Sequence, residues 1–564
     1  MTLKARAAFC LASALVLAAP GWADGNAGAY LAGRTAFLES DFPEASRYFS
    51  QALVQDPKNI ELMENAILSY VSQGDIDHAL AIARRLNGLE GGDQIANIVL
   101  LTDAVRAGDF DRALKLVATD SSVGPLVDGL AKAWVLVGQG KMSAALDGFR
   151  DVSKQPGMKG FGLFHQALAL ALVGDLESAE KLLSGKSGAD IPPTRRSILA
   201  RVEVLSQLER NDEALELIRS TFGNQLDPAL EEMVARLEAG ESLPMTTIRS
   251  VSDGLAEVYF SVAGALRGEA NDGYTLLYSR LAEFLRPDHV DAILLNAQLL
   301  ENLGQFEQAT KAYDRIPRDD PAFLSAELGR AEALRRAGNV DASIEVLQQL
   351  GKTFPDRASV HTALGDTYRR LKKYADAAEA YDRAIALFDK PEVAQWSLFY
   401  RRGISRERID RWNEAEADFR RALELQPDQP QVLNYLGYSF VEMGTNLEEA
   451  LDMIERAVAG RPNDGYITDS LGWVLYRLGQ YDAAVGHMER AAELMPVDPI
   501  INDHLGDVYW AVGRKREAEF QWNRALSFEP EEDDARRIRR KIEVGLDRVL
   551  EEEGAEPLAL AHDD

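Results

Sequence analysis

Histidine, cysteine and serine motifs are the features with which this chain of 564 residues could do covalent or metal-assisted chemistry. The chain has no HExxH motif, no glycine-rich phosphate loop and no nucleophile elbow. Its seven histidines are scattered, and no two share a predicted helix at the spacing of metal ligands: His78, His165, His289, His361, His487, His504 and His562. We therefore predict that the chain is not an enzyme and that it has no metal site and no cofactor.

The N-terminus has the pattern of a secretory signal peptide. Lys4 and Arg6 precede an apolar run over residues 7–19, and small residues lead to Ala23, where we expect cleavage. An uncleaved membrane anchor is the alternative, but the run is shorter than the roughly 20 residues of a membrane span. The sequence thus predicts a signal peptide at 1–23 and a periplasmic protein, with no transmembrane segment beyond it.

Cys10 is the only cysteine, and it lies inside the predicted signal peptide. A lipoprotein signal places its cysteine at the cleavage point, whereas Cys10 stands in the middle of the apolar run. We therefore do not expect a lipid anchor, and cleavage would leave a chain without disulfides or thiol chemistry.

The charge of the chain restricts its partners. The formal net charge is -28 and the isoelectric point is near 4.8. Nucleic acids and anionic membrane surfaces select clustered lysine and arginine, so neither is expected as a partner. A protein or peptide remains the expected partner.

A recurrent alanine shows how the chain is organised. Its steps cluster on 34 residues, as in a tandem array of helical hairpins. The alanines are Ala45, Ala79, Ala113, Ala145, Ala179, Ala214, Ala309, Ala377, Ala415, Ala450, Ala484 and Ala518. Such an array is a binding surface, because each repeat packs mainly on its neighbours.

The clearest units, residues 465–498 and 499–532, show how the two helices of one hairpin are expected to pack. Gly472 and Gly506 lie in the first predicted helix and allow close approach, while Met488 and Trp522 in the second helix supply bulk. This pattern resembles the tetratricopeptide repeat (TPR). The resemblance implies an all-α fold, a tetratricopeptide-repeat superhelical solenoid of helical hairpins with a C-terminal capping helix.

The register of the repeats suggests six segments. We expect about six degenerate repeats in the first array and about eight in the second. The segments are a signal peptide at 1–23, an N-terminal array at 24–228, a helical joint at 229–255, a C-terminal array at 256–532, a capping helix at 533–553 and a flexible tail at 554–564.

The resemblance also implies that the first helix of each hairpin lines a concave groove. In the last three repeats the groove positions carry an aromatic stripe edged by carboxylates, suited to anchoring a protein. The alternative is that neighbouring elements bury these side chains. The candidate residues are Tyr438, Tyr466, Asp469, Trp473, Tyr476, Asp503, Asp507 and Trp510.

A second, basic stripe follows the middle repeats. It could receive a carboxylate, but we expect surface ion pairs with the many nearby acidic residues. The lysine and asparagine of the known carboxylate clamp are absent, since those places hold Leu328, Glu332, Thr362 and Asp366. The arginines are Arg335, Arg336, Arg369, Arg370, Arg401, Arg402 and Arg408.

The repeats over residues 433–526 resemble those of bacterial envelope proteins, including a lipoprotein adaptor of a carboxyl-terminal processing protease. That resemblance implies a scaffold or adaptor that binds such a protease and cell-wall hydrolases. A structural component of an envelope secretion, pilus or polysaccharide-export complex is the alternative. The sequence does not indicate an oligomeric state.

Overall fold

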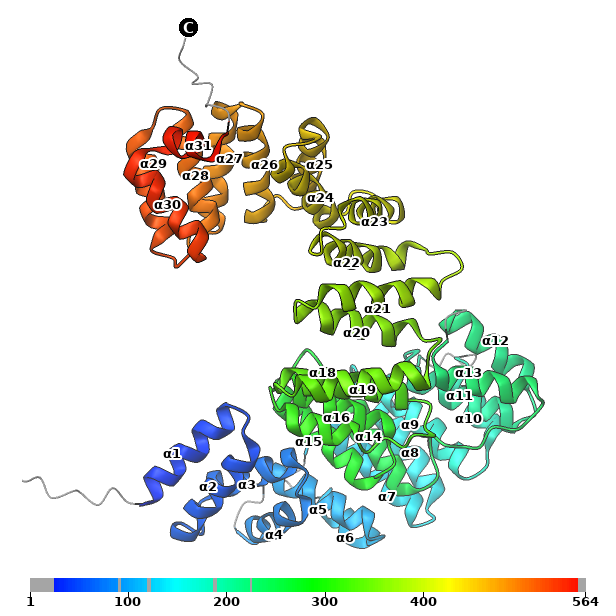
Figure 1. Ribbon diagram of the computed structural model, residues 1–564. Coiled ribbons are helices and arrows are strands. Elements are labelled where there is room, and N and C mark those ends of the chain that lie inside the picture. Colours follow the sequence, from blue (N-terminus) through cyan, green and yellow to red (C-terminus); the bar gives the residue numbers. More distant parts are fainter. Residues whose placement is uncertain (1–24, 90–92, 119–122, 186–189, 224–225, 556–564) are drawn as a thin grey trace, which may run out of the picture. The chain divides into compact units, whose positions relative to one another are not determined.

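The computed structural model describes residues 25–89, 93–118, 123–185, 190–223 and 226–555 (Figure 1). These residues form helices and no strand, so the predicted all-α class is confirmed. The predicted signal peptide, and the predicted tail from residue 556, lie outside the described residues.

The chain forms two compact units, residues 1–346 and 347–564. The first contains α1 (Gly25–Leu38), α2 (Phe42–Gln55), α3 (Ile60–Gln73), α4 (Ile76–Asn87), α5 (Gln94–Arg106), α6 (Phe110–Leu116), α7 (Pro125–Gly138), α8 (Met142–Ser153), α9 (Lys159–Leu172), α10 (Leu176–Leu183), α11 (Arg195–Gln207), α12 (Asn211–Phe222), α13 (Pro228–Glu238), α14 (Val251–Leu266), α15 (Asp272–Leu285), α16 (Val290–Asn302), α17 (Phe306–Tyr313) and α18 (Phe323–Arg336). The division falls within α19 (Val340–Thr353).

The second unit contains α20 (Ala358–Arg370), α21 (Tyr374–Ala386), a 3₁₀ turn (Val393–Gln395), α22 (Trp396–Glu407), α23 (Trp412–Leu425), α24 (Pro430–Met443), α25 (Leu447–Gly460), α26 (Gly465–Arg477), α27 (Tyr481–Leu494), α28 (Pro499–Ala511), α29 (Lys515–Leu526), α30 (Glu532–Val544) and α31 (Leu546–Glu553). Consecutive helices pack as antiparallel hairpins, for example α26 with α27 and α28 with α29.

Close contact at one small residue fixes the geometry of each hairpin. Gly472 lies against Met488, and Gly506 lies against the ring of Trp522. A Cβ atom at either glycine would come closer than 3.0 Å to that partner. The small and bulky positions of the repeat therefore work as a pair, one on each helix of the hairpin.

The predicted joint at 229–255 is not where the two compact units divide. Six hairpins precede α13, which packs on α12, and residues 239–250 then run without a helix. Glu203 accepts hydrogen bonds from the Thr246 hydroxyl and the Thr247 amide, while Arg286 donates to both threonine carbonyls. The segment is thus fixed inside the first unit, because its backbone groups are paired on both sides.

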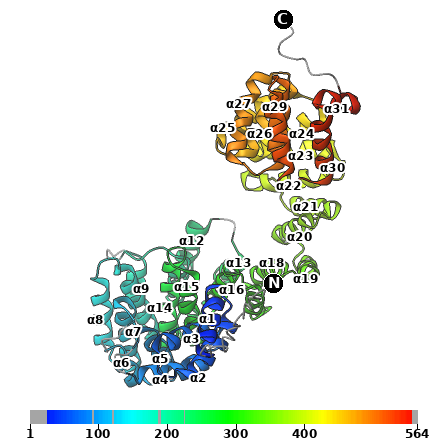
Figure 2. The ribbon, with the colours of Figure 1, turned by 90° about the vertical axis from the view of Figure 1, so that its left-hand side faces the viewer.

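Helices α14 and α15 fold back into the first unit. Figures 1 and 2 show these green helices beside the blue and cyan ones; α14 packs against α5, α7 and α9, and α15 packs against α3 and α5. The Thr102 and Tyr259 hydroxyls lie 3.1 Å apart, and Arg280 donates to the Ser72 carbonyl at 3.2 Å. The chain itself therefore covers the first helices of its N-terminal hairpins.

The predicted capping helix at 533–553 is two helices, α30 and α31, broken at Gly545. Gly545 has a left-handed backbone, with φ of 85°, and any Cβ atom there would meet the Trp510 ring closer than 3.0 Å. Only glycine suits both conditions, so the helix must turn at this residue.

Replacing Gly254 with alanine tests whether α14 folds back and packs against the N-terminal helices. The new methyl group would collide with the Trp134 ring, since an ideal Cβ at Gly254 lies closer than 3.0 Å to it. We expect a loss of about 1–3 kcal/mol and faster hydrogen exchange in α7 and α14. Gly264→Ala on the same helix meets nothing within 4 Å, so it should be neutral or stabilising. Equal exchange in the two variants would contradict the packing.

Candidate functional site

The eight residues predicted from the C-terminal groove fall on three successive first helices, α24, α26 and α28. The Trp473 ring stacks between its neighbours, with its centroid 4.0 Å from that of His504 and 4.7 Å from that of Tyr476. His504 Nδ1 lies 3.1 Å from the carboxylate of Asp469. The structure therefore brings most of the predicted residues together, and it adds His504, which the repeat pattern does not single out.

The two C-terminal helices cover this cluster. Lys541 of α30 is fully buried, and its Nζ lies 2.8 Å from a carboxylate oxygen of Asp503 and 2.7 Å from one of Asp507. Trp510 Nε1 donates to Asp547 of α31 at 3.0 Å. A buried cation between two carboxylates repays part of its desolvation only through such close geometry.

Burial favours the alternative in which neighbouring elements cover the aromatic stripe. Trp473, Tyr476 and Trp510 are 9%, 7% and 8% exposed, and Tyr438 is half-buried. The three carboxylates, Asp469, Asp503 and Asp507, are also buried. Of the predicted residues, Tyr466 is exposed, at 54%. Partner binding by this set stays a prediction. Tyr466 is accessible to a partner as the structure stands, whereas the buried residues would require the covering helices to move.

Several arginines of the predicted basic stripe pair with acidic neighbours. This agrees with the expectation of ion pairing over capture of a free carboxylate. The pairs are Arg335–Glu332 at 2.6 Å, Arg401–Asp366 at 2.8 Å, Arg402–Asp418 at 2.6 Å and Arg408–Glu407 at 3.3 Å.

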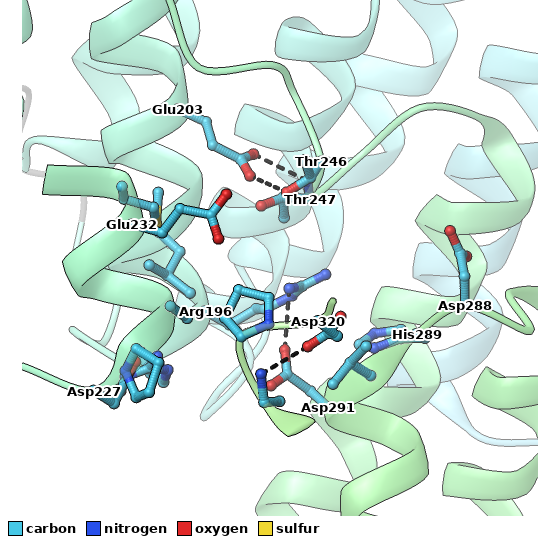
Figure 3. A pocket seen from close by; sticks show the side chains of 18 of the residues that line it. Arg196, Glu203, Asp227, Glu232, Thr246, Thr247, Asp288, His289, Asp291 and Asp320 are labelled. Carbon is cyan, nitrogen blue, oxygen red and sulfur yellow. Dashed lines mark hydrogen bonds and ion pairs between the residues drawn. The ribbon is translucent and has the colours of Figure 1, made fainter. Parts of the chain in front are cut away.

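A cleft of about 630 Å³ opens in the first unit, at the end of the covered helices. One side is formed by α11, α13 and the segment before α14, and the other by the α15–α16 turn, α16 and the start of α18. Figure 3 shows Glu232 on the α13 side and Asp291 and Asp320 on the other. Half-buried Leu199, Met233 and Leu294 give the cleft apolar surface.

A buried ion cluster lies beneath the cleft. Glu257 of α14 is fully buried; Arg196 Nε donates to it at 3.0 Å, and His289 Nε2 lies 3.2 Å away. Burial alone would raise the pKa of Glu257, but Arg196 and His289 hold it below its ordinary value. The cluster joins α11, α14 and the start of α16, so it fixes the two sides of the cleft relative to each other.

The carboxylates of the cleft are not all paired. Asp291 pairs with Arg196 at 3.1 Å and Asp227 with Arg195 at 2.7 Å. Among the described residues, Glu232 and Asp320 have no lysine or arginine partner. Burial raises the pKa of Asp320, and neighbouring Asp291 adds to this effect.

This cleft was not among the sites predicted from the sequence. Its residues come from segments that lie up to about 130 positions apart, and repeat periodicity links only neighbouring hairpins. The usable signal was the break in the 34-residue period around residues 229–254, where a lone helix with flanking prolines interrupts the array.

The described residues contain no group of three or more His, Cys, Asp or Glu arranged to hold a metal ion. In the same residues, every helix is too short or too polar to span a bilayer.

Removing the buried cation tests the covering role of α30. In Lys541→Met, the buried Asp503 and Asp507 lose their shared partner, and we expect a loss of about 3–5 kcal/mol. Arg536→Met on the same helix breaks an exposed pair with Asp533 and should cost less than about 1 kcal/mol. Urea unfolding followed by tryptophan fluorescence measures both. Similar midpoints for the two variants would show that Lys541 does not hold α30 in place.

His504 should titrate above its ordinary pKa of 6.5. Burial alone would lower this pKa, but Asp469 raises it, with smaller effects of Asp503 and Asp507. A raised histidine pKa stabilises the fold below 6.5, and this contribution is lost as the pH rises through the folded value. NMR titration of labelled histidine should show the raised pKa, and Asp469→Asn should lower it. A pKa at or below 6.5 in the parent would contradict the arrangement.

Comparison with known proteins gives the family of the repeats. Tetratricopeptide-repeat models match residues 294–358, 358–391, 400–465 and 470–535. The TPR repeat-containing protein PA4667 of Pseudomonas aeruginosa is 29% identical over 194 residues, which are 34% of this chain and 32% of that protein. Human aspartyl/asparaginyl beta-hydroxylase is 24% identical over 30% of this chain and 24% of its own length. The chain thus matches about a third or less of the length of these relatives.

Among solved structures, the Cut9-Hcn1 hetero-tetramer of the APC/C matches 92% of this chain and 96% of its own, with 13% identity and a TM-score of 0.37. MamA matches 29% of this chain and 94% of its own, with 22% identity and a TM-score of 0.27. The family models and the PA4667 relative confirm the predicted tetratricopeptide repeats, whereas the predicted resemblance to a protease adaptor stays a prediction. The chain therefore contains tetratricopeptide repeats over these matched residues, within an all-α fold of helical hairpins.

Proposed function

We propose that this protein is a non-catalytic scaffold of the bacterial cell envelope that binds a protein or peptide partner at the cleft of the first unit. Tetratricopeptide repeats are suited to protein–protein interaction and are typically non-catalytic. The cleft carries the proposal, because it combines apolar surface with unpaired carboxylates. It lies beside the first helices of the N-terminal hairpins, which α14 and α15 cover. Such a mixture suits recognition of a polypeptide segment.

The envelope location rests on the sequence. The signal-like residues 1–23 support export from the cytoplasm. Within the envelope, the proposed role is an adaptor that delivers substrates to a periplasmic carboxyl-terminal processing protease in cell-wall turnover. The resemblance of residues 433–526 to envelope adaptors supports this role.

The alternative is a structural component of a secretion, pilus or polysaccharide-export complex. In that case the repeats would act as a spacer, and the cleft would not decide which proteins bind. The acidic charge of the chain is compatible with both roles, so a test has to address the cleft itself.

Blocking the cleft separates these roles. Glu232 is exposed and lines the cleft, so Glu232→Trp should fill it without disturbing a core. Glu231→Trp, next to it on α13 but outside the cleft, is the matched control. The parent chain from residue 24 and both variants would be used to capture proteins from the native envelope, followed by mass spectrometry.

We expect the parent and Glu231→Trp to retain a processing protease or cell-wall hydrolases, and Glu232→Trp to lose them. Export components captured equally by all three chains would instead favour the spacer. Capture of no specific protein by the parent would count against a scaffold at this cleft.

A further inference from the structure

The cleft lies next to the hairpins whose first helices are covered by α14 and α15. Helices α14 and α15 already cover α3, α5, α7 and α9, through contacts that include the Tyr259 and Arg280 side chains. The cleft begins at α11, immediately beyond the buried pair of Arg196 with Glu257. A partner segment can therefore enter here without displacing any helix of the unit.

The cations of the cleft are already engaged. Arg195 pairs with Asp227, Arg196 with Glu257 and Asp291, and Arg236 with Glu241. Arg286 donates to the carbonyls of Thr246 and Thr247 and lies 3.3 Å from Asp288. An incoming carboxylate would have to compete with these partners, so the cleft does not favour an acidic ligand.

Two carboxylates remain for a ligand. Asp320 is half-buried, and one of its oxygens accepts the Ala322 amide at 2.8 Å; its other oxygen has no cation in the described part of the chain. Glu232 stands exposed at the rim on the α13 side. Partial burial of Asp320, together with the nearby Asp291, disfavours its negative charge, so a cation bound in the cleft would stabilise it.

A second feature of the cleft also lacks a partner. Thr247 lines it with a side chain that is only 1% exposed, and its hydroxyl makes no hydrogen bond within the described residues. Buried hydroxyls in folded proteins are nearly always paired, with protein groups or with water. The unpaired Thr247 hydroxyl and the unpaired carboxylates are thus two independent signs of a polar ligand.

We propose that the cleft binds a protein partner through one lysine or arginine side chain. Its cation pairs with Asp320 under the added negative charge of Glu232, and its aliphatic stem packs on Leu199, Met233 and Leu294. Long basic side chains combine an apolar stem with a charged head, which matches this lining. The inference rests on the proposed function and names the chemistry that the same cleft selects.

A displayed random-peptide library selected on the full chain tests this proposal. Enriched sequences should share one lysine or arginine, and replacing it with norleucine should weaken binding about tenfold or more. Binding would be measured by fluorescence anisotropy at about 0.15 M salt, where loose attraction between exposed charges is largely screened.

Matched protein variants separate the cleft from the general acidity of the chain. Glu232→Gln with Asp320→Asn should weaken binding about tenfold or more, because both changes remove cleft charges while the new side-chain amide retains an acceptor for the Ala322 N–H. Glu231→Gln with Asp319→Asn removes the same charge from neighbouring positions outside the cleft and should leave binding within about twofold.

Three results would overturn the inference. Enriched peptides without a basic residue, yet blocked by Glu232→Trp, would leave the protein-binding cleft standing and reject its preference for cations. Equal weakening by the two variant pairs would show that only the overall charge attracts the peptides. Failure to enrich any peptide blocked by Glu232→Trp would count against the proposed function as well.

Discussion

The buried carboxylate of Glu257 is the constraint on which the first unit depends. An ionised carboxylate is very costly to bury unless cations and hydrogen-bond donors surround it. Arg196 of α11 and His289 at the start of α16 meet that need. Since Glu257 lies on α14, the ion cluster can form only when α14 has returned to the N-terminal hairpins. Apolar packing then completes the return, with Tyr259 fully buried nearby.

The packing of α14 and α15 on the N-terminal hairpins changes which surface of the repeats is accessible to a partner. Hairpin repeats usually present their first helices as a continuous binding groove. Here the chain covers that face along α3 to α9 and leaves a cleft at α11 and α13. In the second unit, α30 and α31 cover the last hairpins through Lys541 and Trp510. In both units, therefore, the chain's own helices occupy surfaces that the repeat pattern alone would leave open.

The sequence was informative about local structure and much less so about these long-range contacts. The repeat register places helix starts at Pro430, Gly465 and Pro499, where α24, α26 and α28 begin. Such features repeat because each hairpin needs the same close contact, as between Gly472 and Met488. The Arg280–Ser72 contact spans 208 positions, whereas repeat periodicity links only neighbouring hairpins.

The same limit explains why the sequence left the burial of the C-terminal stripe open. The repeat pattern indicates groove positions, but it carries no information on the helices that cover the end of the array. In the sequence, Lys541 is one more charge in a polar helix, yet it is fully buried between Asp503 and Asp507. A break at Gly545 was equally hard to foresee, since it depends on the ring of Trp510, 35 positions earlier.

Hydrogen exchange of the full chain, with and without a bound protein partner, tests the central claim most directly. The account predicts protection of α11, α13 and the start of α18 around the cleft, while α3, α5, α14 and α15 exchange as in the free protein. Faster exchange in α14 and α15 together with new protection on α3 and α5 would contradict it. That result would show that a partner displaces the returning helices and binds the groove they cover.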